Sequence, residues 1–135
     1  MADKKDLARA LAGDLRLADA DLSGADLDDV DLMSADLRGA DLRGARLRGA
    51  FFNGANLNGA SLRGVLAMGA QFVGATLVET DLSGGIFVAA DFGGSDLFRA
   101  SLRGADFTKA NTAHGYIEEA DLSGVIGLKY KSHGR

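Results

Sequence analysis

A five-residue period runs without insertion or deletion through most of this 135-residue chain. A typical unit is Ala-Asp-Leu-Arg-Gly at residues 35–39. Every fifth residue from Leu17 to Leu122 is the centre of one of 22 units, and 20 of the centres are Leu, Phe or Ile. The residue two before the centre is Ala in 15 units, and the residue two after it is Gly in 13. So regular a pattern is compatible with very few folds.

Neither a helix nor an ordinary strand places these centres on one side. A step of five residues turns a helix by about 140°, and in a strand it moves to the opposite face. A chain that turns a corner in every unit avoids this problem. The Ala and the centre then point inward from a three-residue strand, and the residue between them points outward. The last two residues form the turn, where Gly adopts positive φ at little cost.

The turn residues indicate how many corners make one coil. Stacked corners form a solenoid whose coils lie about 4.8 Å apart and share backbone hydrogen bonds. A period of 20 places the glycines of one turn in a single column without exception: Gly24, Gly44, Gly64, Gly84, Gly104 and Gly124. A period of 15 scatters the non-glycine turns over all columns. We therefore predict four corners per coil.

With tandem Ala-(Asp/Asn)-Leu-x-Gly units over about four-fifths of its length, the chain resembles the pentapeptide repeat family. The resemblance implies an all-β fold, a right-handed quadrilateral parallel β-helix. At 20 residues per coil, residues 15–124 form about 5.5 coils. It also implies a candidate role, since some members protect type II topoisomerases from quinolones by imitating DNA. Many other members have no assigned role.

Residues 1–14 are predicted to form a short capping helix and a lead-in to the coils. Asp3 is a suitable N-cap, Leu7 and Leu11 share one face, and Gly13 is a suitable C-terminal stop. So short a helix is marginal alone, so we expect it to pack on the open end of the first coil.

The segment 125–135 follows the last complete unit. Ile126, Leu128 and Tyr130 alternate with other residues, and a polar, basic end follows. An uncovered solenoid end exposes unpaired backbone groups, which favours pairing with another chain. We predict that two copies form a homodimer here with these three side chains buried. The alternative is that the segment folds over its own end as a cap.

Some inward positions depart from Ala. Val65 and Ala67 exchange a small and a large side chain within one layer, which conserves volume. Gly85 is one of several small residues that replace the inward Ala without adding much bulk. Thr112 is the weakest centre, and its hydroxyl needs a hydrogen-bond partner if it is buried.

The net charge of −4 is unevenly distributed, because acidic residues crowd the first units. They form a candidate acidic surface: Asp19, Asp21, Asp26, Asp28, Asp29, Asp31, Asp36 and Asp41. A group of basic residues overlaps and follows them: Arg38, Arg43, Arg46, Arg48 and Arg63. These arginines interrupt any phosphate-like row of acids. Direct binding of nucleic acid is disfavoured by the negative net charge and by the absence of interleaved aromatic residues.

No catalytic, cofactor or metal site is expected. Successive outward carboxylates lie on different faces, Cys is absent, and no phosphate-binding loop follows the glycines. We therefore expect a protein without enzymatic activity. The start lacks the apolar stretch of a secretory signal, and no segment is long and apolar enough to span a membrane. A cytoplasmic location is the expectation.

A cluster of apolar side chains in outward and turn positions is the most informative feature for function. Leu66 and Ile86 are one coil apart, and Met68 and Val88 occupy the adjoining turns. These four residues are the candidate partner patch, since stacked exposed apolar groups are typical of contact surfaces. The alternative is that they only raise β-propensity. The sequence thus predicts a rigid protein-binding or scaffold module with an unidentified protein partner. DNA-mimicking regulation of a topoisomerase such as gyrase is the alternative.

Overall fold

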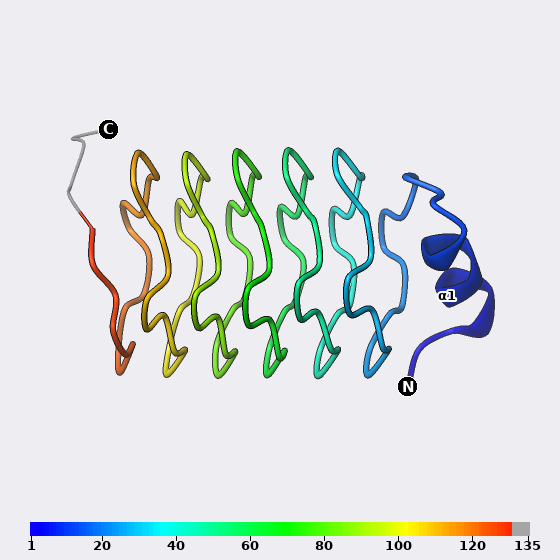
Figure 1. The fold of residues 1–135 in the computed structure, drawn as a ribbon, viewed down its shortest axis with the longest axis horizontal. Helices are drawn as coiled ribbons and strands as arrows, with labels where there is room; N and C mark the ends of the chain where they lie inside the picture. The colour runs from blue at the N-terminus through cyan, green and yellow to red at the C-terminus, as the bar shows by residue number, and fades with distance from the viewer. Residues whose placement is uncertain (131–135) are drawn as a thin grey trace.

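The computed structural model describes residues 1–130 and shows a rod of stacked coils with one helix at its N-terminal end (Figure 1). Parallel bridges join residues that are 20 apart in the sequence. They run from Arg16 with Asp36 at one end to Asp106 with Ile126 at the other. This offset confirms the predicted coil of four units. The chain is therefore a β-solenoid, in which each coil contacts only its neighbours.

Within a unit, the two inward side chains are buried and the outward residue forms the bridge. Ala35 and Leu37 are fully buried, whereas Asp36 between them bridges to Asn56. Residues 1–130 contain no strand longer than one such bridge residue, so the predicted three-residue strand is too long. Two turn residues follow each centre at once, so the chain changes direction before a longer ladder forms.

The second turn position has positive φ in every unit, as predicted. Glycine occupies most of these positions, but Glu79 and Arg99 also adopt φ of 57° there. Gly39 is constrained twice, because a Cβ at this position would lie 2.4 Å from Oδ1 of Asp19 on the preceding coil. Replacement of this glycine would therefore require both a strained backbone and a shift of the Asp19 side chain.

Leucines fill most of the core, and phenylalanines replace them in two of the four columns of centres from Phe52 onward. The rings of Phe52, Phe72 and Phe92 stack nearly parallel, with centroids 5.1 and 4.7 Å apart. Phe87 packs edge-on against Phe72 at 6.1 Å. A Cβ at Gly85 would lie only 2.4 Å from the Phe87 ring. Gly85 is therefore more than a small substitute for Ala, because its missing side chain makes room for this ring.

Other departures from Ala and Leu behave as predicted. Val65 and Ala67 are both fully buried, which agrees with an exchange of volume within one layer. The buried Thr112 hydroxyl donates a hydrogen bond to the backbone carbonyl of Lys129, and Thr80 donates to the Leu57 carbonyl at 2.7 Å. Both hydroxyls thus have the partner that burial requires.

The helix α1 spans Lys4–Leu11 and closes the N-terminal end of the rod. Asp3 is its N-cap and accepts a hydrogen bond from the Asp6 N–H, as predicted, and Gly13 follows the helix with a φ of +83°. Leu11 lies on the same face of the helix as Leu7 but does not pack on the first coil. Its side chain is 61% exposed, and the helix buries Ala10 instead.

Hydrogen bonds join α1 to the edge of the first coil. The Asp3 N–H donates to the Asp21 carbonyl at 3.0 Å, and the Asp21 N–H donates to Oδ2 of Asp6 at 2.8 Å. One coil further on, Asp41 donates its N–H to the Ala20 carbonyl in the regular ladder. The helix therefore supplies the donor and acceptor that a preceding coil would provide.

At the other end, the chain leaves the last coil as an extended segment. Ile126 still belongs to the ladder, since its N–H donates to the Ala105 carbonyl at 2.9 Å. Leu128 then packs partly against the core. Residues 131–135, the predicted basic end, lie outside the described residues.

Candidate binding surfaces

The outward carboxylates have a shared structural role in their own turns. In each case an Asp or Asn side chain accepts a hydrogen bond from the backbone N–H two residues later, as Asp21 does from Ser23 at 3.1 Å. All twelve repeat units with Asp or Asn in the outward position contain this bond, at Asp21, Asp26, Asp31, Asp36, Asp41, Asn56, Asp81, Asp91, Asp96, Asp106, Asn111 and Asp121. These acids complete the turns, because an outward acceptor satisfies a donor that the coil leaves free.

The candidate acidic surface is divided over several faces and partly neutralised. Asp36 pairs with Arg38 at 2.6 Å, and Asp41 pairs with Arg43 at the same distance. The hydrogen bonds from the Arg38 side chain lower the pKa of Asp36 to about 2. Asp19 and Asp29 lie at positive-φ turn positions instead of outward ones.

The predicted basic residues are all engaged in ion pairs. Asp28 contacts both Arg46 and Arg48, at 3.2 and 2.8 Å, and Arg63 lies 3.7 Å from Asp81. With Arg38 and Arg43 paired as above, this group of arginines offers no unpaired row of cations. Its geometry does not favour binding of a phosphate backbone.

Asp28 has a role that sequence reasoning missed. Its Oδ1 accepts the backbone N–H of Arg48, one coil later, at 2.8 Å, because the outward residue of that unit is Arg46 and cannot accept. The side-chain hydrogen bonds from Arg48 are the largest cause that lowers the pKa of Asp28 to about 2. Asn53 and Asn58 similarly accept from the next coil, at Val73 and Val78. An Asp or Asn in the first turn position, 20 residues before a turn without its own acceptor, is the sequence signal.

The structure places the four residues of the apolar patch side by side. Leu66 and Ile86 form a parallel bridge, and Met68 and Val88 occupy the adjoining turns. All four side chains are half-buried. Within residues 1–130, the backbone N–H groups of Met68 and Val88 have no hydrogen-bond acceptor. Their outward neighbours are apolar, so no carboxylate completes these two turns.

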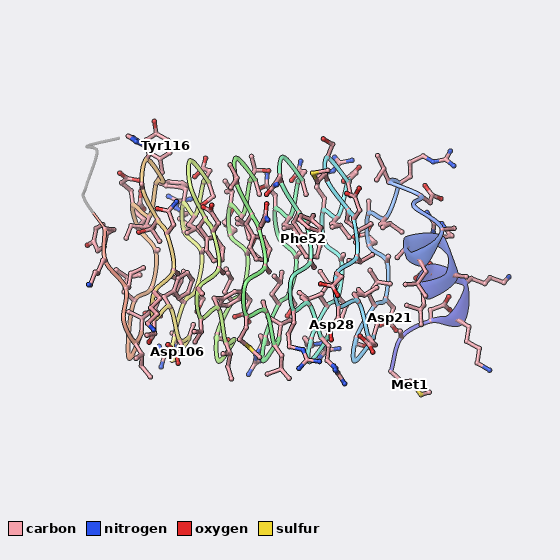
Figure 2. All side chains as sticks on the ribbon, viewed as in Figure 1. Met1, Asp21, Asp28, Phe52, Asp106 and Tyr116 are labelled. Carbon is pink, nitrogen blue, oxygen red and sulfur yellow. The ribbon has the colours of Figure 1, made fainter. Side chains whose placement is uncertain are left out.

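The same column of turns has carboxylates on both sides of the patch. Asp28 accepts the Arg48 N–H on one side, and Asp106 accepts the Thr108 N–H at 2.9 Å on the other. Figure 2 shows Asp28 and Asp106 along the same lower edge of the rod, and Phe52 inside it. In this column the turn N–H groups are therefore bound by a carboxylate on both sides of the apolar patch but not within it.

The candidate C-terminal contact residues separate into two groups. Ile126 and Tyr130 are 56% and 50% exposed, whereas Leu128 packs partly against the core. The backbone N–H groups of Leu122 and Gly124 in the last coil have no acceptor within the described part of the chain. This end thus combines exposed apolar side chains with free donors.

A groove beside α1 was not predicted. It encloses about 620 Å³, and its apolar wall includes the exposed side chains of Leu11, Leu15 and Met33. Asp28 and Asp31 lie at its polar side. The sequence feature that could have predicted the groove is Leu15. It is a large apolar residue in the inward position of the first unit, where no preceding coil can cover it.

Within residues 1–130, no group of three or more His, Cys, Asp or Glu side chains could hold a metal ion. The single helix of this part is too short to cross a membrane.

The repeats and the coils of this chain are similar to those of known proteins. The family model of pentapeptide repeats matches residues 16–54, 49–84, 77–111 and 86–126. No curated protein sequence matches the chain. A solved pentapeptide repeat protein from the thylakoid lumen of Arabidopsis thaliana is 33% identical, with a TM-score of 0.69 over 70% of this chain and 66% of that one. The chain thus spans slightly less than two thirds of that protein.

Two further solved structures are similar at lower TM-scores. A pentapeptide repeat protein from Nostoc PCC 7120 is 29% identical, with a TM-score of 0.38 over 93% of this chain and 94% of that one. QnrB1, a plasmid-mediated fluoroquinolone resistance protein, is 22% identical in a trypsin-treated form. Its TM-score is 0.46, over 78% of this chain and 58% of that one. From its repeats, its coils and the family model, the chain belongs to the pentapeptide repeat family.

Proposed function

We propose that this protein is a non-enzymatic, rigid binding module that contacts a protein partner through the apolar patch. The observation that carries the proposal is the stacked pair Leu66 and Ile86, which bridge on adjacent coils while most other outward residues are polar. Two aligned apolar side chains with Met68 and Val88 beside them form one continuous surface. Such a surface is typical of a contact site and unlike single exposed apolar residues.

The rigidity of the rod supports this proposal. Backbone hydrogen bonds hold the patch to the coils on both sides, since Leu47 donates to the Leu66 carbonyl and Phe87 donates to the Asp106 carbonyl, each at 2.7 Å. A surface that is already ordered loses little conformational entropy when it binds. A modest apolar area can therefore give a useful affinity.

DNA-mimicking regulation or protection of a type II topoisomerase such as gyrase is the alternative function. Four exposed carboxylates near the N-terminal end favour it, because they make no ion pair within the described residues: Asp19, Asp26, Asp29 and Asp31. The arginines paired with Asp28, Asp36 and Asp41 oppose it, since they interrupt the row. The family resemblance implies this role for some members only.

We also propose that two copies pair through the C-terminal end. The support is the exposure of Ile126 and Tyr130 together with the free donors of Leu122 and Gly124. Two identical ends that meet about a twofold axis would bury the same side chains on both copies. A protein partner at the apolar patch remains accessible in this arrangement, because the patch lies on the side of the rod.

The first prediction concerns the patch. The double variant Leu66→Asp/Ile86→Asp should lose a protein that the wild type captures from source-cell extract, since charge replaces the apolar contact. Its thermal stability should stay within about 0.5 kcal/mol of the wild type, because Asp is the usual outward residue and completes its own turn. Val73→Asp, an exposed position on another face, is the matched control. Equal capture by all three proteins would refute the proposal.

The second prediction concerns the topoisomerase. Because arginines neutralise part of the acidic surface, we expect no protection of gyrase supercoiling from a quinolone at stoichiometric excess of this protein. Clear protection in this assay would instead establish the alternative. In that case Asp26→Asn/Asp31→Asn should abolish it while leaving the turns intact, because Asn also accepts the turn N–H.

The third prediction concerns the homodimer. Light scattering at high micromolar concentration should give the mass of two chains, and Ile126→Asp should give the mass of one. Val73→Asp again serves as a control that changes charge without changing this end. A monomeric wild type at that concentration would show that the C-terminal end does not pair.

The fourth prediction concerns acid. The pKa of Asp28 falls from its ordinary value of 3.8 to about 2 in the folded chain. Its stabilising effect is therefore fully present above about pH 4 and is lost as the pH falls towards 2. Asp28→Asn keeps an acceptor for the Arg48 N–H but does not titrate. The difference in urea midpoint between wild type and variant should shrink between pH 4 and pH 2, and a constant difference would contradict the assignment.

A further inference from the structure

Along one column of turns, two adjacent backbone N–H donors are free, and the donors on both sides of them are bound. The N–H groups of Arg48 and Thr108 are bound by the carboxylates of Asp28 and Asp106 at 2.8 and 2.9 Å. Between them lie the N–H groups of Met68 and Val88, which have no acceptor within residues 1–130. Because these turns belong to adjacent coils, the two free donors lie about 4.8 Å apart.

These donors are positioned for a carboxylate oxygen. At Asp106, one coil beyond Val88, the acceptor is a carboxylate that also accepts the Thr108 hydroxyl at 2.6 Å. The fold thus already places carboxylates against turn donors of this column. At the patch the outward residues are Leu66 and Ile86, so an equivalent oxygen has to come from another molecule. A hydrogen bond to a charged acceptor is stronger than one to a neutral acceptor.

Two exposed guanidinium groups, which can donate hydrogen bonds to a ligand, lie beside the patch. Leu66 bridges to Arg46 on the preceding coil, and Arg48 occupies the turn before Met68. The two guanidinium groups share the single carboxylate of Asp28, and their side chains remain 47% and 46% exposed. Asp26 bridges to Arg46, and the charges of Asp26 and Asp29 also act on Arg48, so both arginines are balanced from the side away from the patch. On the far side the Asp106 carboxylate is engaged by both donors of Thr108.

From these observations we infer that the apolar patch binds an acidic-apolar peptide segment, in which Asp or Glu alternates with Leu or Val. Its carboxylates accept hydrogen bonds from the N–H groups of Met68 and Val88 and lie near Arg46 and Arg48. Its aliphatic side chains pack on Leu66 and Ile86. The inference rests on the proposed function, because it specifies the chemistry of the partner that the patch receives.

The test uses the full chain labelled with ¹⁵N and the synthetic peptide acetyl-Leu-Asp-Leu-Asp-Leu-amide. Titration should move the amide protons of Met68 and Val88 downfield, towards the position of amides bound by a carboxylate, as at Thr108. A matched peptide with Asn in place of Asp should bind about 5-fold more weakly, which corresponds to the loss of charge assistance in one hydrogen bond. A peptide with Lys in place of Asp should cause no shift of these amides.

Two variants separate the donors from the apolar surface. In Leu66→Asp/Ile86→Asp, the new carboxylates accept the N–H groups of Met68 and Val88, as Asp106 accepts that of Thr108. The signals of these two amides should therefore already lie downfield, and the acidic peptide should not bind. Leu66→Ala/Ile86→Ala leaves the donors free, so the acidic peptide should still shift both amides, with weaker affinity. Equal binding of the Asp and Lys peptides, or shifts confined to other faces, would overturn the inference. If capture of a cellular protein still depends on the patch in that case, the proposed function stands and only the acidic chemistry fails.

Discussion

The backbone hydrogen bonds between coils are the interaction on which the rest of this structure depends. These bonds pair residues that lie 20 apart in the sequence, so the position of every side chain is fixed by its place in a unit. The bonds require all coils to have the same outline, and hence turns with positive φ at every corner. They also require a core of nearly constant width. The replacement of Ala by Gly85 beside the Phe87 ring shows how closely the interior obeys that limit.

The turns have a second requirement, which explains most of the surface acidity. Each turn leaves an N–H group pointing outward, and an Asp or Asn in the outward position accepts it. Where that position holds another residue, Asp28 or Asn53 can accept it from the preceding coil. The main role of many acidic residues in this protein is therefore to accept hydrogen bonds from its own backbone. Turns whose N–H group has no acceptor, such as those of Met68 and Val88, are therefore the better candidates for contact with a ligand.

The sequence was sufficient for the period, the four-unit coil, the direction in which Ala and Leu point, and the N-cap at Asp3. These features follow from local rules that repeat in every unit. It was also sufficient to predict that Leu66 and Ile86 lie side by side, since the period determines which residues are neighbours. It failed where a contact depends on a particular shape. The exposure of Leu11 depends on how α1 sits on the first coil, and the groove beside Leu15 and Met33 depends on the same placement. The role of Asp28 does not follow from the pattern within one unit, because the N–H group that it accepts lies 20 residues away on the next coil.

The helix α1 makes the two ends of the rod unequal. Asp3 and Asp6 occupy the donor and acceptor of Asp21, so the N-terminal edge has no backbone groups of Asp21 left to offer another chain. A stack of coils is in principle a template that could grow in both directions, as fibrous assemblies do. Because the helix covers this part of the N-terminal edge, the pairing proposed at the C-terminal end would be the more accessible contact between coils. In the proposed pair, a helix at each outer end would disfavour the stacking of a further chain, which is the way in which fibres of repetitive chains grow.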